Sequence, residues 1–162
     1  MTPPFQSQQQ VVVHASLAAV WAFSMDLSKI PEFHPRVFKV DFISGKTSRE
    51  AGVAYQCHLR GGKHTCVEKD VEIVSMEKIV TVMPEDTFGI TKILSDYTVE
   101  TTFHELGASE TEVKISHYYS TTSLKAKLLN LIAKRKIARE TQATLNAVKK
   151  VIETEASQAQ SA

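Results

Sequence analysis

The hydrophobic positions of this chain follow two different periods. Residues 11–15 form a short β-branched run, and much of the segment from 37 to 119 alternates apolar with polar positions, as half-buried strands do. Glycine- and proline-containing turns separate these runs. We therefore predict strands at 11–15, 37–42, 53–59, 65–75, 78–83 (ended by Pro84), a long one ending near 105, and 113–119.

Helical spacing appears in two places. Ser16 is a good N-cap, because its hydroxyl can accept an otherwise unpaired amide of the first turn, and apolar residues follow it at helical spacing. A second short turn at 26–33 ends near His34. After residue 123 one apolar stripe predicts a helix to about residue 155, roughly 48 Å long. The stripe consists of Leu124, Leu128, Leu131, Ala138, Leu145, Val148 and Ile152.

These elements predict an α+β domain over residues 11–155. A curved antiparallel sheet of about six or seven strands would wrap around the long C-terminal helix, with two short helices after the first strand. We expect residues 1–10 to be flexible. Residues 156–162 are small and polar, and we expect them to form a disordered tail.

The hairpin around Gly61-Gly62 has two candidate registers, which place opposite faces of the second strand inward. A two-residue turn sets Cys57 opposite Cys66 but matches an apolar face to Glu68, Asp70 and Glu72. A three-residue loop instead matches Cys57 to Val67 and Val53 to Val71. We predict the three-residue loop, which puts the two cysteines on opposite faces and Lys69 on the inward one.

Composition excludes several classes of protein. The 162 residues are 43% hydrophobic, and 19 Lys and Arg against 18 Asp and Glu give a formal net charge of +1, whereas nucleic-acid modules are usually far more basic. No apolar run is long enough for a transmembrane helix, and residues 1–10 lack the basic and apolar regions of a secretory signal, so we expect none. The cysteines, Cys57 and Cys66, form no disulfide framework. We expect a cytoplasmic protein with reduced thiols.

The element order and two segments resemble the START/Bet v 1-like superfamily, and specifically its polyketide cyclase/dehydrase and lipid-transport branch. The opening is carried by residues 11–21, Asp26, Pro31 and residues 34–37, and the end by residues 124–129, 145–150 and Glu153. The resemblance covers residues 11–155 and implies a helix-grip fold. It says less about function, since the superfamily includes lipid carriers, hormone receptors, cyclases and chaperone activators.

Several side chains are expected to point between the sheet and the long helix. One interpretation is a ligand cavity with a few polar groups in an apolar wall. The other is a filled core whose hydroxyls are satisfied. The residues predicted to line the cavity are Tyr55, Cys57, Tyr97, Val99, Phe103, His117, Tyr119, Leu128 and Ile132.

Two further hypotheses concern catalysis and metal binding, and no sequence motif supports either. His117 could act as a general base near neutral pH, but no motif fixes such an arrangement, and we assign no catalytic residue. Cys57, His58, His64 and Cys66 invite a zinc hypothesis, but their spacing is unlike structural zinc sites, and alternation separates Cys57 from His58. We expect neither a metal nor a cofactor.

The last helix has a basic side at residues 134–139 and 149–150. A solvated face explains it, and a weak contact with an anionic membrane surface is the alternative. Altogether the sequence favours a protein that binds or transports a hydrophobic small molecule such as a lipid, isoprenoid or polyketide, with no nucleic-acid partner. A cyclase/dehydrase-type enzyme using the same cavity is the alternative, and a protein–protein adaptor is a third.

Overall fold

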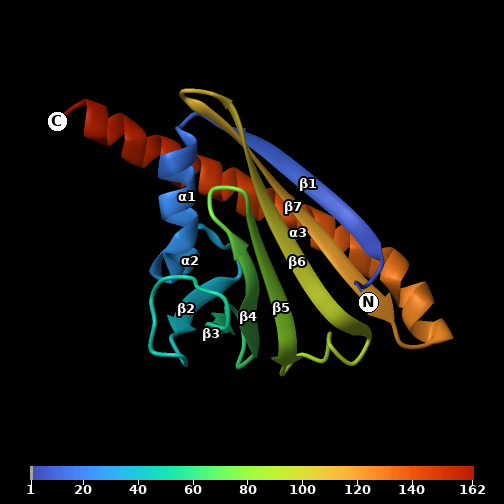
Figure 1. The fold of residues 1–162 in the computed structure, drawn as a ribbon. Coiled ribbons are helices and arrows are strands. Elements are labelled where there is room, and N and C mark those ends of the chain that lie inside the picture. The colour runs from blue at the N-terminus through green and yellow to red at the C-terminus, as the bar shows by residue number, and fades with distance from the viewer. Residues whose placement is uncertain (1) are drawn as a thin grey trace.

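The computed structural model describes residues 2–162. Its centre is a curved, seven-stranded antiparallel sheet in the order β1-β7-β6-β5-β4-β3-β2, crossed by the long helix α3 (Figure 1). This confirms the predicted helix-grip α+β class. The elements in chain order are β1 (Phe5–Val13), α1 (Leu17–Met25), η1 (Leu27–Lys29), α2 (Ile30–Phe33), β2 (Val37–Asp41), β3 (Ala54–Leu59), β4 (Thr65–Val74), β5 (Lys78–Asp86), β6 (Leu94–Gly107), β7 (Glu110–Thr121) and α3 (Leu124–Gln160).

The predicted helix starts are present. The Ser16 hydroxyl accepts the amide of Ala19 at 3.3 Å and caps α1. The Ser123 hydroxyl accepts the amide of Ala126 at 3.1 Å and caps α3 in the same way. Within residues 2–162 no helix is both long and apolar enough to cross a membrane.

Three predicted boundaries differ from the structure. Residues 5–10, expected to be flexible, belong to β1 because their backbone pairs with β7. β5 continues past Pro84 to Asp86, since the β4–β5 ladder is irregular opposite this point and leaves room for a residue without an amide hydrogen. The tail predicted to be disordered continues α3 as far as Gln160.

The predicted register of the β3–β4 hairpin is wrong. Cys57 lies opposite Cys66, not Val67, so the two cysteines share the inward face. Asp70 is fully buried on that face, while Val71 is 45% exposed. A buried carboxylate needs a partner, and Arg49 supplies one from the loop before β3, at 2.7 Å. The charge that counted against this register is therefore compensated by a residue from another segment.

The apolar stripe of α3 does not lie on one buried side. Leu145, Val148 and Ile152 are buried and belong to the same core cluster as Val13 and Phe23. The earlier members are solvent-exposed: Leu124 is 83%, Leu128 69% and Leu131 65% exposed. The second half of α3 therefore packs on the sheet, while the first half meets it mainly through small and polar side chains such as Ala126 and Asn130.

Candidate functional site

The buried apolar side chains form three separate clusters, where a small domain usually has one continuous core. One joins α1, β1 and the second half of α3. Another joins η1, α2, β3 and the start of β4. The smallest contains Leu94, Tyr97 and Tyr119, with Val99 packed against it. Buried polar side chains lie beside these clusters, in two groups.

The first group surrounds His117 on β7. The Nε2 atom of His117 lies 2.8 Å from the Thr141 hydroxyl of α3, and that hydroxyl donates its only hydrogen to the Ile137 carbonyl at 2.8 Å. Thr141 must therefore accept from an Nε2–H group. In a neutral imidazole Nδ1 then carries no proton and accepts the Tyr97 hydroxyl at 3.0 Å. For a neutral ring, these contacts therefore define the Nε2–H tautomer of His117.

Burial reinforces this protonation state. His117 is 7% exposed, and burial lowers its pKa from 6.5 to about 4. The pKa of Tyr97 is raised by burial, with the neighbouring Tyr119 and Glu68 adding to the shift. Neither of these groups ionises near neutral pH. His117 therefore holds Tyr97 and α3 in place, and its basic nitrogen is already occupied.

Polar atoms of β1 adjoin this group. Ser7 is paired directly with His117 across the β1–β7 ladder, so both side chains lie on the same face of the sheet. Gln9 follows two residues later on that face. The Ser7 hydroxyl and the Gln9 carbonyl oxygen are buried and have no protein partner within residues 2–162. Buried polar atoms are nearly always satisfied, so these two can accept a hydrogen bond from water or from a ligand.

We call this group the His117 site. It is built from strands β1, β6 and β7 and from helix α3. Its members are Ser7, Gln9, Tyr97, His117, Tyr119 and Thr141.

The second group, the Arg49 cluster, consists of Arg49, Tyr55, Glu68, Asp70 and Thr81. The guanidinium Nη1 lies 2.7 Å from Asp70 Oδ1 and 2.8 Å from the Tyr55 hydroxyl. Tyr55 donates to Glu68 at 2.8 Å, and Thr81 donates to Asp70 Oδ1 at 2.7 Å. The cluster thus joins the loop before β3 to β3, β4 and β5.

Arg49 and Asp70 form a buried ion pair within the Arg49 cluster. Burial raises the pKa of Asp70, and Arg49 offsets only part of that shift. Arg49 also donates through Nε to the Ser24 carbonyl at 2.9 Å, which ties the cluster to α1. Asp70 Oδ2 has no protein partner among the described residues. Removing one member of such a pair leaves an uncompensated buried charge, so the cluster fixes the position of this loop.

The structure places the predicted cavity residues in different surroundings. Tyr97, His117 and Tyr119 lie together at the His117 site, and Val99 packs against the cluster of Tyr97 and Tyr119. Tyr55 and Cys57 are buried in a second cluster, beside Arg49.

Three other predicted cavity residues lie elsewhere. Phe103 packs edge-on against Trp21 at 5.2 Å, in the core cluster of α1. Leu128 and Ile132 are each 69% exposed on the outer side of α3, which contradicts their predicted inward orientation.

Sequence reasoning missed several members of the two groups. Glu68 and Asp70 alternate with Cys66 along β4 and would have been found from the rejected hairpin register. Thr141 lies four residues before Leu145 on the buried side of α3, so helical spacing offered a signal. Arg49 and Ser7 gave no local signal, because only the fold brings the loop to β4 and β1 to β7.

Cys57, Cys66 and Glu68 are the residues best placed to hold a metal ion, with ligand atoms all within 4.8 Å of one another. A thiol binds zinc as a thiolate. However, a hydrogen bond with Cys66, together with burial, raises the pKa of the Cys57 thiol. Glu68 is already hydrogen-bonded to Tyr55. The set therefore fits a protonated thiol pair better than a zinc site.

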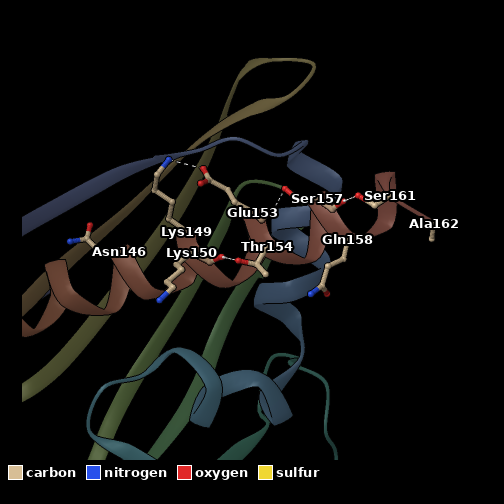
Figure 2. Close-up of a pocket in the computed structure, with 9 residues that line it drawn as sticks. All are labelled: Asn146, Lys149, Lys150, Glu153, Thr154, Ser157, Gln158, Ser161 and Ala162. Atoms are coloured by element: carbon tan, nitrogen blue, oxygen red, sulfur yellow. Dashed lines mark hydrogen bonds and ion pairs between the residues drawn. The ribbon is translucent and has the colours of Figure 1, made fainter.

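A surface hollow along the end of α3 is a poor candidate for an apolar ligand. Figure 2 shows that the nine residues lining it all belong to the final part of the chain, and most are polar. Small-molecule sites are concave and mostly apolar. The residues are Asn146, Lys149, Lys150, Glu153, Thr154, Ser157, Gln158, Ser161 and Ala162. A smaller hollow lies between the end of α1 and residues 47–48.

Comparison with known proteins decides the family. Residues 4–153 match the family model described as polyketide cyclase / dehydrase and lipid transport. The chain belongs to this family. The match covers most of the chain and confirms the resemblance stated from the sequence. No curated protein matches the sequence.

Solved structures agree on the fold of this member of the polyketide cyclase/dehydrase and lipid-transport family. Norcoclaurine synthase from Thalictrum flavum has a TM-score of 0.75 at 15% identity, with 96% of this chain and 98% of that chain covered. The Zhui aromatase/cyclase from Streptomyces sp. R1128 gives 0.70 at 19% identity, covering 91% and 92%. A START superfamily protein from Mycobacterium smegmatis gives 0.66 at 11% identity, covering 91% and 99%. At such low identity the similarity is one of fold.

Proposed function

We propose that the protein binds a small molecule with an apolar body and at least one polar group, between the concave face of the sheet and α3. The observation that carries this proposal is the pair of buried polar atoms on Ser7 and Gln9 that lack a protein partner. Ser7 lies opposite His117, which contacts Tyr97, and Gln9 lies opposite Ile115, which packs against the core cluster of α1. An apolar wall with a few polar groups is typical of small-molecule sites. A lipid, an isoprenoid or a polyketide has this chemistry.

Burial of the apolar body would supply most of the affinity, at about 25 cal/mol per Å² before the costs of association. The polar group would fix orientation. Gln9 Oε1 can only accept, so the ligand should offer a hydroxyl or another donor to it. The Ser7 hydroxyl can donate or accept, and so tolerates a carbonyl as well.

Binding without turnover is favoured by the state of His117. Both of its nitrogens are hydrogen-bonded, and burial lowers its pKa to about 4. A general base needs a free lone pair and a pKa near the working pH. His117 meets neither condition, so its role is to orient Tyr97.

A cyclase/dehydrase-type enzyme is the second candidate, and Glu68 is the observation in its favour. This carboxylate accepts the Tyr55 hydroxyl at 2.8 Å and lies near enough to Tyr97 to raise the pKa of that phenol. A carboxylate with a neighbouring phenol could remove a proton and stabilise an enolate. Two of the structural relatives are named as an aromatase/cyclase and a synthase.

Native mass spectrometry of the full chain tests the proposal. The protein would be mixed in turn with a long-chain fatty acid, a polyprenol and an aromatic polyketide. We expect a one-to-one complex with at least one of these classes, and an unchanged ligand mass after incubation. Failure to retain any of them would contradict binding. A change of ligand mass that is lost in Glu68→Gln would favour the enzyme.

A matched pair of variants locates the binding site. Val99 packs against the cluster that adjoins His117, and Thr98 lies on the opposite face of β6. Val99→Trp should obstruct the proposed ligand site and lower the fraction of bound ligand at least tenfold, while Thr98→Trp should leave that fraction unchanged. Circular dichroism of both variants, and the milder Val99→Phe, separate loss of binding from loss of folding. Equal binding by Val99→Trp and the wild type would place the ligand elsewhere.

A further inference from the structure

The first half of α3 exposes large apolar side chains to solvent. Leu124 is 83%, Leu128 69%, Leu131 65% and Ile132 69% exposed. Single exposed apolar residues are common on soluble proteins, but a contiguous group marks an interaction surface. Residues 124–139, which we call the α3 docking segment, carry such a group.

Helix geometry shows that this group points away from the protein. With 3.6 residues per turn, positions 124, 128, 131 and 135 share one side of α3. Residues on the other side make the contacts with the domain: Asn130 accepts the Tyr119 hydroxyl at 2.7 Å, and Ile137 packs against the cluster of Tyr97 and Tyr119. In Figure 1 these first turns (orange) lie at the margin of the sheet, beside β1 and β7.

Positive charge surrounds the exposed apolar side chains. The segment holds six basic residues and no acidic one. These are Lys125, Lys127, Lys134, Arg135, Lys136 and Arg139. The ion pairs of α3 use Glu140, Lys149, Glu153 and Glu155, all of which lie beyond residue 139. The charge of the docking segment is thus available to an external partner.

We propose that the α3 docking segment binds the surface of an anionic lipid bilayer. Helices that lie in the bilayer interface have an apolar face that enters the headgroup boundary and lysines that reach the phosphates from either side. On α3, Lys127 lies to one side of the Leu128–Leu131 line and Lys125 and Lys136 lie to the other. Each basic residue near such a surface should strengthen binding by about fivefold.

The same features disfavour other partners. A second copy of the chain would bring two segments of six positive charges together, and these would repel. Nucleic acids are bound mainly by basic groups on the phosphates, and a central row of leucines offers them nothing. The proposal is independent of the interior ligand, since the apolar side chains it uses, those of Leu124, Leu128, Leu131 and Ile132, are exposed and are not members of the His117 site.

Vesicle co-sedimentation of the full chain tests this inference. We expect binding to phosphatidylcholine vesicles containing 30% phosphatidylserine, weak binding to pure phosphatidylcholine, and a loss of binding as salt rises. Leu128→Glu/Leu131→Glu should reduce binding more than tenfold. Leu106→Glu is the matched control, because Leu106 is also exposed, at 49%, but lies in the β6–β7 hairpin region. Lys134→Gln/Lys136→Gln should weaken binding about 25-fold.

Three results would overturn the proposal. One is no binding to the anionic vesicles at any salt concentration. Another is an equal loss of binding in Leu106→Glu. The third is a dimer, seen by analytical ultracentrifugation without lipid, that Leu128→Glu/Leu131→Glu abolishes, which would assign the segment to self-association. Because Leu128, Leu131 and Lys136 are exposed and Lys134 is only partly buried, both double variants should fold, and circular dichroism verifies this.

Discussion

Both halves of α3 carry large apolar residues but use most of them in opposite ways. In the second half, Leu145 is fully buried and Ile152 is 3% exposed, both within the core cluster of α1 and β1. In the first half, Leu128 and Leu131 face solvent, and the contacts with the sheet come from other residues such as Asn130 and Ile137. The apolar residues of this one helix therefore form two different surfaces, one buried in the core and one exposed to solvent.

The largest expected effect lies in the buried half. Leu145→Ala should lower the free energy of unfolding by about 2–5 kcal/mol, because it removes buried methyl groups and leaves a cavity that neighbours only partly fill. Urea unfolding followed by circular dichroism measures this. A loss below about 1 kcal/mol would mean that α3 does not pack on the core at this turn.

The next effect concerns pH. The pKa of His117 falls from 6.5 to about 4 on folding, so between these values the unfolded chain binds a proton that folded His117 does not. Stability should therefore decrease as pH falls from 6.5 to 4, by about 3 kcal/mol from this residue. Unfolding free energies of wild type and His117→Gln over this range should differ in slope.

His34 is the internal comparison for this prediction. Burial also lowers its pKa to about 4, so the wild type should lose stability through both histidines. His34→Gln and His117→Gln should each remove part of the slope, and the double variant most of it. A His117→Gln profile parallel to the wild type would contradict a neutral, buried imidazole.

A smaller effect is expected at the contact between α3 and His117. Thr141→Val keeps the shape of the side chain but leaves the His117 Nε2–H group without its acceptor, which should cost about 1–3 kcal/mol. Thr154→Val is the matched control, since Thr154 is exposed and its hydroxyl bonds only to the backbone of Lys150 at 2.7 Å. Thermal unfolding of the pair should separate them, and equal melting temperatures would argue against the assigned tautomer.

The smallest effect on stability is expected in the exposed first half of α3. Leu128→Ala and Leu131→Ala should change stability by less than about 0.5 kcal/mol, because neither side chain is buried. The same unfolding assay used for Leu145→Ala provides the measurement. A loss of 2 kcal/mol or more in either variant would place the first half of α3 over the core.

The sequence predicted the elements well because local periodicity encodes them. The error over α3 has a geometric cause. Residues repeating every seven positions drift by about 20° per repeat on a straight helix, so Leu124 and Ile152, 28 positions apart, differ in direction by about 80°. A stripe that looks continuous in the sequence therefore moves from the outer side of the helix towards the buried one.

The candidate site was harder to predict than the fold. Alternation identified Tyr97, His117 and Tyr119 as inward, and they do lie together. The hairpin register was missed because burying Asp70 appeared unfavourable, and its partner Arg49 comes from a loop whose position no local pattern fixes. Only the fold brings Arg49 to Asp70, so no sequence pattern indicated that the buried carboxylate would be paired.

The most direct test of the central claim is nuclear magnetic resonance of the chain with labelled histidines, titrated with a ligand that native mass spectrometry has identified. His104 and His64 are exposed and serve as internal references. If the ligand binds between the sheet and α3, the resonances of His117 should shift with saturation at one equivalent while those of His104 and His64 stay in place. Unchanged His117 resonances at full occupancy would contradict a binding site at this position.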